Sequence, residues 1–131
     1  MPADALLVLQ ASVTKTDTFN GAPLILKAGT PRRGLKARVI YSAASAASGT
    51  DTVTFSVDVC YDGVPTTWQV ASSAPPITLT TTAQSGEIYI PFEVSPTSIA
   101  NGTQIRLTAT FSSAAHTDTI TYYGDVMLVR Q

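Results

Sequence analysis

Apolar and polar residues alternate along most of the chain, and this period of two predicts β-strands with one buried face. The alternation is clearest at Leu35–Tyr41 and Val53–Tyr61. The same pattern, or a short apolar run between turn residues, predicts further strands at 5–13, 23–27, 66–71, 77–81, 87–92, 104–111 and 119–130. The pattern therefore predicts an all-β fold, a single-domain two-sheet antiparallel sandwich of about eight strands, either jelly-roll or immunoglobulin-like.

Turn residues and small residues separate the predicted strands. Asp62-Gly63-Val64-Pro65 predicts the tight turn of a hairpin, and Pro91 places its strand at a sheet edge or near a strand end. The stretch YSAASAASGT, residues 41–50, has no apolar stripe and predicts a connecting loop of small side chains. Two interpretations are open: the small residues are merely tolerated, or they let a neighbouring subunit approach closely at Ala44 and Ala46.

Two segments of the chain repeat one pattern. TDTVTFSVDV at 50–59 and TDTITYYGDV at 117–126 share threonines, an aromatic residue and two aspartates at the same offsets. Either strand composition converged in a threonine-rich chain, or the two strands occupy comparable places in facing sheets. In the second copy, Gly124 predicts a weakened strand or a bulge.

Composition limits the function classes. The chain has 131 residues, 13% of them charged, and a formal net charge of −1. This fits one domain, 1–131, with residues 1–5 as a possible N-terminal arm, and it argues against nucleic-acid binding. Cys60 is the only cysteine, which excludes an intramolecular disulfide, and its position on the polar side of a strand predicts an exposed thiol. The apolar run 5–9 is too short for a signal peptide or a membrane span, so we expect synthesis in the cytoplasm and no membrane segment.

No set of residues predicts catalysis. His116 is the only histidine and lies in a predicted loop beside Asp118, without a nucleophile motif. Glu87 and Glu93 would form a glycosidase-like pair only if the fold brought them together. The carboxylates do not follow a metal-ligand spacing, and there is no glycine-rich phosphate loop. We expect no enzymatic activity, no metal and no cofactor.

Two features indicate binding. Arg32, Arg33, Lys36 and Arg38 lie within seven residues, and they form either a patch that pairs with acidic groups on a partner or a solvated strand face. Trp68, with Tyr61 nearby, forms either a sugar-stacking platform or a cover over one end of the sandwich.

Three segments of the sequence resemble a known class of proteins. The segments RRGLKARVIYSAASAASGTDTVTFSVDVCYDG, GEIYIPFEVSP and NGTQIRLTATF resemble the small β-sandwich virion proteins of tailed bacteriophages, in particular capsid decoration or cement proteins. The resemblance covers roughly residues 32–111 and carries no invariant motif. It implies a protein made in the host cytoplasm that binds the outside of the phage head, often as a trimer, and clamps the major capsid protein lattice.

On this basis we expect the partner interface to include the N-terminal arm, the basic run and the small residues of the loop. These residues are Pro2, Ala3, Asp4, Arg32, Arg33, Lys36, Arg38, Ala44 and Ala46. Two alternatives stay open. One is another virion component, such as a tail tube, tail tip or head fibre. The other is a carbohydrate-binding sandwich that stacks sugars on Trp68, Tyr61, Tyr89 or Tyr122.

Overall fold

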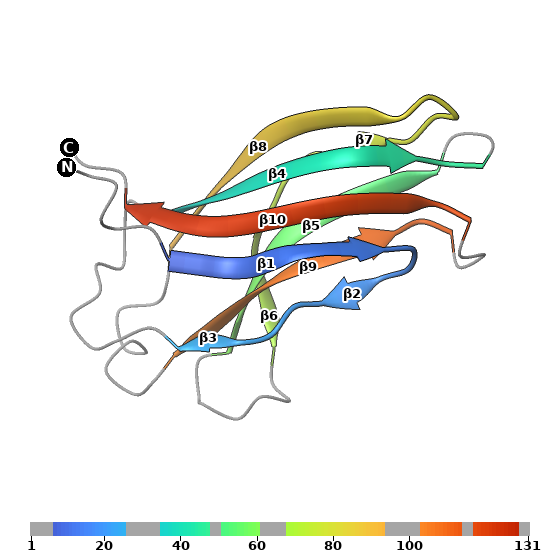
Figure 1. Ribbon diagram of the computed structural model, residues 1–131. Coiled ribbons are helices and arrows are strands. Elements are labelled where there is room, and N and C mark those ends of the chain that lie inside the picture. Colours follow the sequence, from blue (N-terminus) through green and yellow to red (C-terminus); the bar gives the residue numbers. More distant parts are fainter. Residues whose placement is uncertain are drawn as a thin grey trace.

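A computed structural model describes residues 7–25, 35–47, 51–60, 68–93, 103–113 and 117–128. These residues form ten β-strands and no helix (Figure 1). The strands are β1 (Leu7–Lys15), β2 (Phe19–Asn20), β3 (Leu24–Ile25), β4 (Leu35–Ser45), β5 (Thr52–Cys60), β6 (Gln69–Ser73), β7 (Ile77–Thr78), β8 (Gln84–Phe92), β9 (Gln104–Phe111) and β10 (Thr119–Leu128). No helix able to span a membrane occurs among the described residues.

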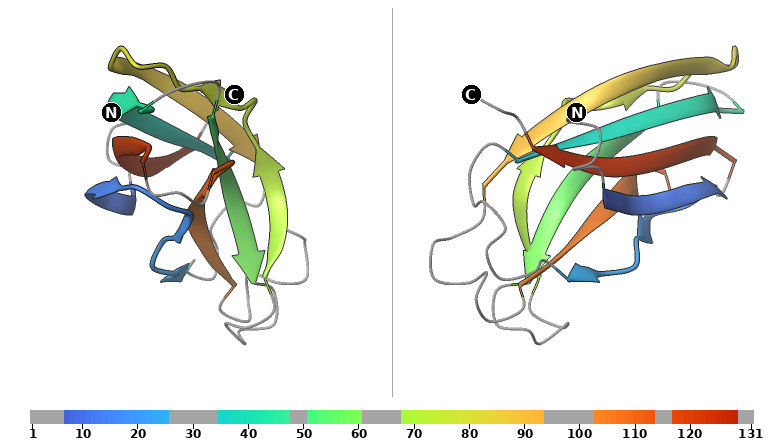
Figure 2. Two further views of the ribbon diagram at one scale, coloured as in Figure 1. Left: turned by 90° about the vertical axis from the view of Figure 1, so that its right-hand side faces the viewer. Right: turned by 60° about the vertical axis from the view of Figure 1, so that its left-hand side comes forward.

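The strands form two antiparallel sheets that face each other as two layers (Figure 2). The four-stranded sheet, sheet A, has the order β1-β10-β4-β8. The six-stranded sheet, sheet B, has the order β2-β9-β5-β6, with β3 paired to β9 and β7 paired to β5. The prediction of a two-sheet antiparallel sandwich is therefore confirmed.

Alternate residues of the central strands fill the space between the sheets. In the middle of the sandwich, the Phe55 ring of β5 meets the Tyr122 ring of β10 edge-on, with centroids 4.9 Å apart. The largest fully buried side chains are Tyr122, Phe55, Leu79, Ile90, Ile105, Leu107, Ile120, Val39, Val53, Val57 and Val59. Burying such side chains stabilises the fold by roughly 1.5–3 kcal/mol each, and the facing rows of them are the main favourable contribution to packing the two layers together.

Most predicted strands are confirmed, with shifted ends. The strand predicted at 104–111 coincides with β9, and Pro91 lies on β8 at the edge of sheet A, as its missing N–H requires. The two-residue strand β2 was not predicted, because two residues are too few to show a period.

The segment YSAASAASGT differs from the predicted loop. Strand β4 continues to Ser45, so the loop prediction is wrong for residues 41–45. The alternation breaks at a bulge, where the pairing with β8 shifts register between Tyr41 and Ala44 and Ala43 has a positive φ of 51°. After the bulge, Ala44 and Ala46 return to the core and are buried.

Candidate functional site

The repeated sequence pattern places β5 and β10 at equivalent positions of the two sheets. Strand β5 lies between β9 and β6 in sheet B, and β10 lies between β1 and β4 in sheet A. Phe55 and Tyr122, which occupy the same position of the repeat, meet across the core. Of the two interpretations of the repeat, the strand order fits the second, in which the two strands take comparable places in facing sheets. The repeat therefore also places Asp58 and Asp125 at equivalent positions on opposite outer faces of the sandwich.

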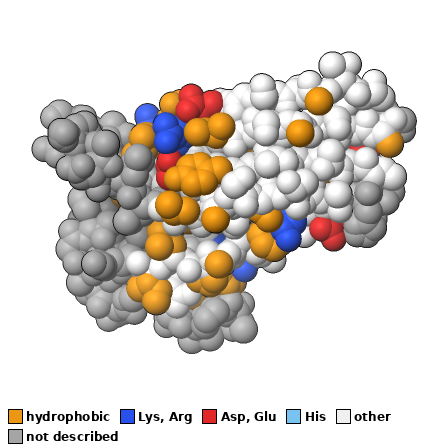
Figure 3. Space-filling model, viewed as in Figure 1, with side chains coloured by type: hydrophobic (Ala, Val, Ile, Leu, Met, Phe, Trp, Pro, Cys, Tyr) orange, Lys and Arg blue, Asp and Glu red, His pale blue; other side chains and the backbone are white. Residues whose placement is uncertain are grey.

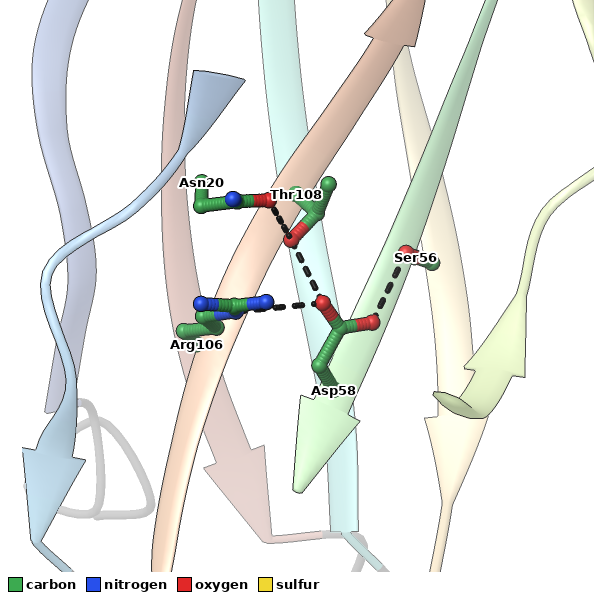
Figure 4. A network of polar contacts seen from close by, with 5 residues as sticks. All are labelled: Asn20, Ser56, Asp58, Arg106 and Thr108. Carbon is green, nitrogen blue, oxygen red and sulfur yellow. Dashed lines mark hydrogen bonds and ion pairs between the residues drawn. The ribbon is translucent and has the colours of Figure 1, made fainter. Parts of the chain in front are cut away.

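On sheet B, Asp58 is the centre of a polar cluster that we call the Asp58 network: Asn20, Ser56, Asp58, Arg106 and Thr108 (Figure 4). Asp58 Oδ1 accepts a hydrogen bond from Ser56 Oγ at 3.1 Å. Asp58 Oδ2 accepts from Thr108 Oγ1 at 2.6 Å and from Arg106 Nε at 3.2 Å. Asp58 is 5% exposed, and these three donors supply the hydrogen bonds that a buried charge requires.

The remaining contact of the network fixes the orientation of an amide. Thr108 Oγ1 lies 3.3 Å from Asn20 Oδ1. The hydroxyl has one hydrogen, which the shorter contact assigns to Asp58. Turning the Asn20 amide by 180° lets its nitrogen donate to Thr108, an assignment that a hydrogen-bond network decides. Ser56, Asp58, Thr108 and the Asn20 amide nitrogen then each have a partner within the network.

Aromatic and apolar side chains surround this network. The Arg106 guanidinium lies over the Trp68 ring, 4.2 Å from its centroid, which is a cation–π contact. Val70 pairs with Asp58 across the strands and is 66% exposed, and Ile25 pairs with Gln104 and is also exposed. The outer face of sheet B therefore combines an aromatic ring, a fixed cation, fixed hydrogen-bonding groups and exposed aliphatic side chains.

On sheet A, Asp125 forms the equivalent pair with Arg38. Arg38 Nη2 donates to Asp125 Oδ2 at 2.6 Å, and Arg38 Nη1 lies 3.8 Å from Glu87 Oε2. The hydrogen bond to Asp125 raises the pKa of Arg38 above its ordinary value, against the opposing effect of burial. Asp125 Oδ1 and Arg38 Nε are buried without a hydrogen-bond partner. This pair is therefore less completely satisfied than the one on sheet B.

Exposed apolar side chains surround the Arg38–Asp125 pair. The Lys36 ammonium lies over the Tyr89 ring, 4.5 Å from its centroid. Partial burial and a hydrogen bond to Glu87 raise the pKa of Tyr89. We call this surface the Arg38 patch, formed by Val8, Lys36, Arg38, Ile40, Glu87 and Tyr89. Val8, Ile40 and Tyr89 are each more than 40% exposed. Charged and hydrophobic side chains gather at one end of this face, whereas the other end is largely neutral and polar (Figure 3).

The structure places only some of the residues predicted for a partner interface. Lys36 and Arg38 share the outer face of β4, as predicted, since they alternate with buried residues. Ala44 and Ala46 lie in the core, so a partner that contacts this segment does not meet their side chains. The other predicted residues lie outside the described part of the chain: Pro2, Ala3, Asp4, Arg32 and Arg33.

The other candidate residues are likewise partly buried, partly at the surface and partly outside the described residues. Cys60 is buried, so the prediction of an exposed thiol is wrong. Tyr122 is buried in the core and cannot stack on a sugar, whereas Trp68 and Tyr89 reach the surface. Tyr61 and His116 lie outside the described residues. Within the described ranges, no three His, Cys, Asp or Glu side chains gather as metal ligands do.

No sequence motif marks Asp58, Arg106 or Asp125 as candidate site residues. Alternation places Asp58 and Asp125 on the outer faces, but it does not show that they are buried there. The sequence feature that could have identified the two aspartates is the repeat, because it places Asp58 and Asp125 at the same position of the two segments.

Comparison with known proteins identifies the fold but not a family. No family model matches the sequence, and no curated protein sequence matches it. The structure is similar to the CBM22-2 xylan-binding domain from Paenibacillus barcinonensis Xyn10C, with a TM-score of 0.54 and 10% identity over 95% of this chain and 86% of that domain. It is also similar to dimeric latent PorU from Porphyromonas gingivalis, with a TM-score of 0.54 and 14% identity over 93% of this chain and 12% of that chain.

A third similar structure is that of infectious bursal disease virus, Gx strain. The TM-score is 0.50 and the identity is 11%, over 92% of this chain and 30% of that chain. At these identities the likeness shows a common β-sandwich fold, which binding modules and virus proteins share, and no more. None of these three structures is a tailed-phage decoration protein, so that resemblance stays a prediction.

Proposed function

We propose that this protein is a non-catalytic structural protein of a phage particle, a capsid decoration protein that binds the outer surface of the major capsid protein lattice. The observation that carries the proposal is the Arg38 patch. Arginine, aromatic and apolar side chains are the types enriched where proteins bind one another. In the patch, Arg38 is held by Asp125 and Glu87, so little side-chain freedom is lost on binding.

The proposed mechanism is mass action on the assembled head. A protein that binds only the expanded lattice stabilises it by RT ln(1 + [L]/Kd) for each site. Repeated sites, and the trimer that we expect, raise the overall affinity without unusually strong contacts at any one site. Arg32 and Arg33 belong to the proposed contact surface because they precede β4 in the chain.

The test is sedimentation with empty heads assembled from the major capsid protein of the phage that encodes this chain. We expect the chain to move with the heads and to saturate at a fixed copy number. Ile40→Asp places a charge in the Arg38 patch and should lower the affinity at least tenfold. Val70→Asp is the matched control, since it changes an exposed aliphatic residue on sheet B.

The outcomes test separately whether the protein binds heads and which of its surfaces makes the contact. If the unchanged chain stays at the top of the gradient at low and at high salt, the proposed function is wrong. If Val70→Asp abolishes binding and Ile40→Asp does not, the protein decorates heads through sheet B. Arg32→Glu with Arg33→Glu should weaken binding most at low salt, where charge pairing is least screened.

A second candidate function, carbohydrate binding, is favoured by the outer face of sheet B. The Trp68 ring supplies an aromatic surface of the kind that sugar rings pack against. Asn20 and Arg106 are the members of the Asp58 network that reach the surface, and the buried Thr108 and Asp58 orient them toward hydroxyl groups of a ligand. The similarity to a xylan-binding domain supports this candidate through the fold alone.

A glycan array and affinity electrophoresis in soluble xylan test the second candidate. Trp68→Ala should abolish any retardation of the protein. Tyr89→Ala, which removes an aromatic ring from sheet A, should leave the retardation unchanged. Binding that both variants retain would exclude the outer face of sheet B as the carbohydrate site.

A further inference from the structure

Strand β8 forms one border of sheet A and leaves its outer edge open (Figure 1). Strand β4 pairs with one edge of β8, and no other strand in the described ranges pairs with it. The backbone N–H and C=O groups along the outer edge therefore have no partner strand in the described part of the chain. Such an edge is a template on which a further strand can pair.

Among the described borders of the two sheets, that of β8 has the longest uninterrupted pairing. Strand β8 pairs with β4 from Gly86 to Phe92 without a register shift. Strand β1, the other border of sheet A, shifts register twice against β10. On sheet B, β2, β3 and β7 have two residues each, and β6 has five residues and one register shift. Because bulges and short strands discourage edge pairing, β8 is the border best suited to accept a further strand.

Pro91 shows which residues of β8 direct their backbone groups to the open edge. On an edge strand, the nitrogen of a proline carries no hydrogen and faces away from the paired strand. This direction alternates along a strand, so Glu87 and Tyr89 also direct their N–H and C=O groups to the open edge. The side chains of Glu87 and Tyr89 are exposed. An added strand would therefore bind the backbone at two positions that also present a carboxylate and an aromatic ring.

The apolar side of β8 is incompletely covered at Ile88. Ile90 and Phe92, on the same side of the strand, are buried in the core. Ile88 packs against the same core but is only partly buried. A strand added at the open edge would cover the rest of this side chain, provided that it presents an apolar residue opposite Ile88.

We propose that two copies of this chain pair through the open edges of β8, antiparallel, about a two-fold axis at Ile88. Ile88 of one copy then lies opposite the partner's Ile88 in a non-hydrogen-bonded pair, in which the two side chains are closest. Glu87 of each copy forms a hydrogen-bonded pair with the partner's Tyr89. The contact is isologous, since each copy contributes the same residues.

The charges along β8 favour a second copy of this chain over an unrelated strand. The Lys36 ammonium lies over the Tyr89 ring, 4.5 Å from its centroid. The Glu87 side chain is 43% exposed. The two-fold pairing brings Glu87 of each copy beside the partner's Tyr89 and its Lys36, so opposite charges meet twice. Glu87 and Tyr89 are equally far from Ile88 along the strand, as a symmetric contact requires.

The pairing joins the two copies of sheet A into one continuous sheet. Its two-fold axis is perpendicular to that sheet, so the Arg38 patches of both copies face the same side. A capsid-binding protein would gain avidity from such a pair, and a dimer serves this purpose as well as the trimer that the resemblance implies. The inference concerns the free chain and does not depend on the proposed function.

The first experiment is sedimentation equilibrium of the unchanged chain from about 1 µM to about 500 µM, a range that covers small and weak interfaces. We expect a reversible equilibrium between monomer and dimer. Glu87→Lys brings like charges together and should weaken the dimer by about tenfold or more. Combining it with Lys36→Glu exchanges the two charges and should restore the dimer. Asp17→Lys, the same charge reversal at an exposed position outside β8, should leave the dimer unchanged.

A disulfide tests the register of the pairing on a Cys60→Ala background. Ile88→Cys should give a disulfide-linked dimer under mild oxidation, because the Cα atoms of a non-hydrogen-bonded pair lie about 4.5 Å apart. Tyr89→Cys should not, because the two copies of this residue are diagonal neighbours, about 7–8 Å apart. Both variants place a thiol on the same strand, so the comparison controls for exposure of the edge.

Two results would overturn the proposal. The first is an unchanged chain that stays monomeric over the whole concentration range, or that forms a trimer without a dimer. The second is a dimer that Glu87→Lys does not weaken, or one in which Tyr89→Cys is linked more readily than Ile88→Cys. A chain that binds phage heads as a monomer would contradict this inference and support the proposed function. A dimer that does not bind heads would do the reverse.

Discussion

Strands β5 and β10 share one sequence pattern and one place in the fold, yet their aspartates are stabilised to different degrees. Asp58 accepts three hydrogen bonds, whereas Asp125 accepts one from Arg38 and keeps one buried oxygen without a partner. Most of the difference comes from the neighbouring strands. Beside β5, strand β9 supplies both Thr108 and Arg106, whereas beside β10, strand β4 supplies Arg38 alone. The third donor, Ser56, lies on β5 itself, and Tyr123 takes its place in β10. A repeated pattern thus fixes the position of a charge, while its neighbours decide how well the charge is satisfied.

The two strands also differ where they face the core. Phe55 of β5 corresponds to Tyr122 of β10, whose hydroxyl is buried without a partner. Val57 corresponds to Gly124, where the missing side chain leaves room for Leu107. The pairing of β5 with β9 is regular throughout, and its pairing with β6 shifts register once, between Val57 and Asp58, whereas β10 pairs irregularly with both β1 and β4. Strand β5 is therefore the more regular copy, although it is not free of irregularity.

The largest expected effect comes from removing the two aspartates. Asp58→Ala leaves Arg106 and two hydroxyl groups without their acceptor and should lower the free energy of unfolding by about 3 kcal/mol. Asp125→Ala should cost about 2 kcal/mol, because Arg38 retains Glu87 nearby. Urea denaturation of both variants measures the two losses. Equal losses, or a larger loss for Asp125→Ala, would contradict the comparison.

Gly124→Ala should be the next most damaging change. A Cβ at this position would lie 2.8 Å from Leu107 Cδ2, and Leu107 is fully buried and cannot move aside freely. We expect a loss of about 1–2 kcal/mol from overpacking. The double variant with Leu107→Ala should lose less than the sum of the two single losses. Simple additivity in urea denaturation would show that the two positions do not compete for space.

Tyr122→Phe makes β10 resemble β5 and should stabilise the protein by about 1 kcal/mol at pH 7, since it removes a buried hydroxyl that has no partner. Burial raises the pKa of Tyr122 to about 12 from an ordinary value of 10.0. Between these values the folded state holds a proton that the unfolded state has lost, so stability falls as the pH rises, by up to about 1.4 kcal/mol per pH unit.

Urea denaturation between pH 7 and pH 11 measures both effects. The loss of stability that Tyr122 causes at alkaline pH should be absent in the Tyr122→Phe variant. The difference in free energy of unfolding between this variant and the unchanged protein should therefore grow above pH 10. An advantage that stays constant with pH would mean that the hydroxyl ionises normally in the folded state.

The smallest effect concerns the bulge in β4, the partner of β10. Ala43 has a left-handed conformation that an alanine adopts at a cost and a glycine adopts freely. Ala43→Gly should therefore raise the free energy of unfolding by about 0.5 kcal/mol. Ala47→Gly, at an exposed position without positive φ, is the control and should lower the stability slightly. If both variants lose stability alike, the bulge is not strained.

The sequence predicted the sandwich because alternation is regular where a strand has one buried face. It failed at residues 41–45, since the bulge at Ala43 shifts the alternation and leaves a run of small residues that matches no period. It also failed for Cys60, which lies on the outer side of β5 and is nevertheless covered. The alternation of apolar and polar residues indicates on which side of a strand a residue lies, but it does not show whether other parts of the protein cover that side.

The candidate sites were less predictable for the same reason. The basic run indicated Lys36 and Arg38. The ion pairs that hold the Arg38 side chain in place are formed with Asp125 and Glu87, which are distant in sequence. The Asp58 network depends on Arg106 and Thr108, which come close only through the pairing of β5 with β9. Such contacts between distant residues follow from strand order, which the chain does not reveal by period alone.

The Arg38 patch and the Asp58 network point in opposite directions, because each lies on the outer side of its own sheet. A capsid bound at one face would leave the other directed away from the particle. The outermost layer of such a particle would then present Trp68 and Arg106 in an ordered array, one copy for each bound chain. Even a feeble individual affinity for a cell-surface polymer would become strong attachment through the number of copies displayed.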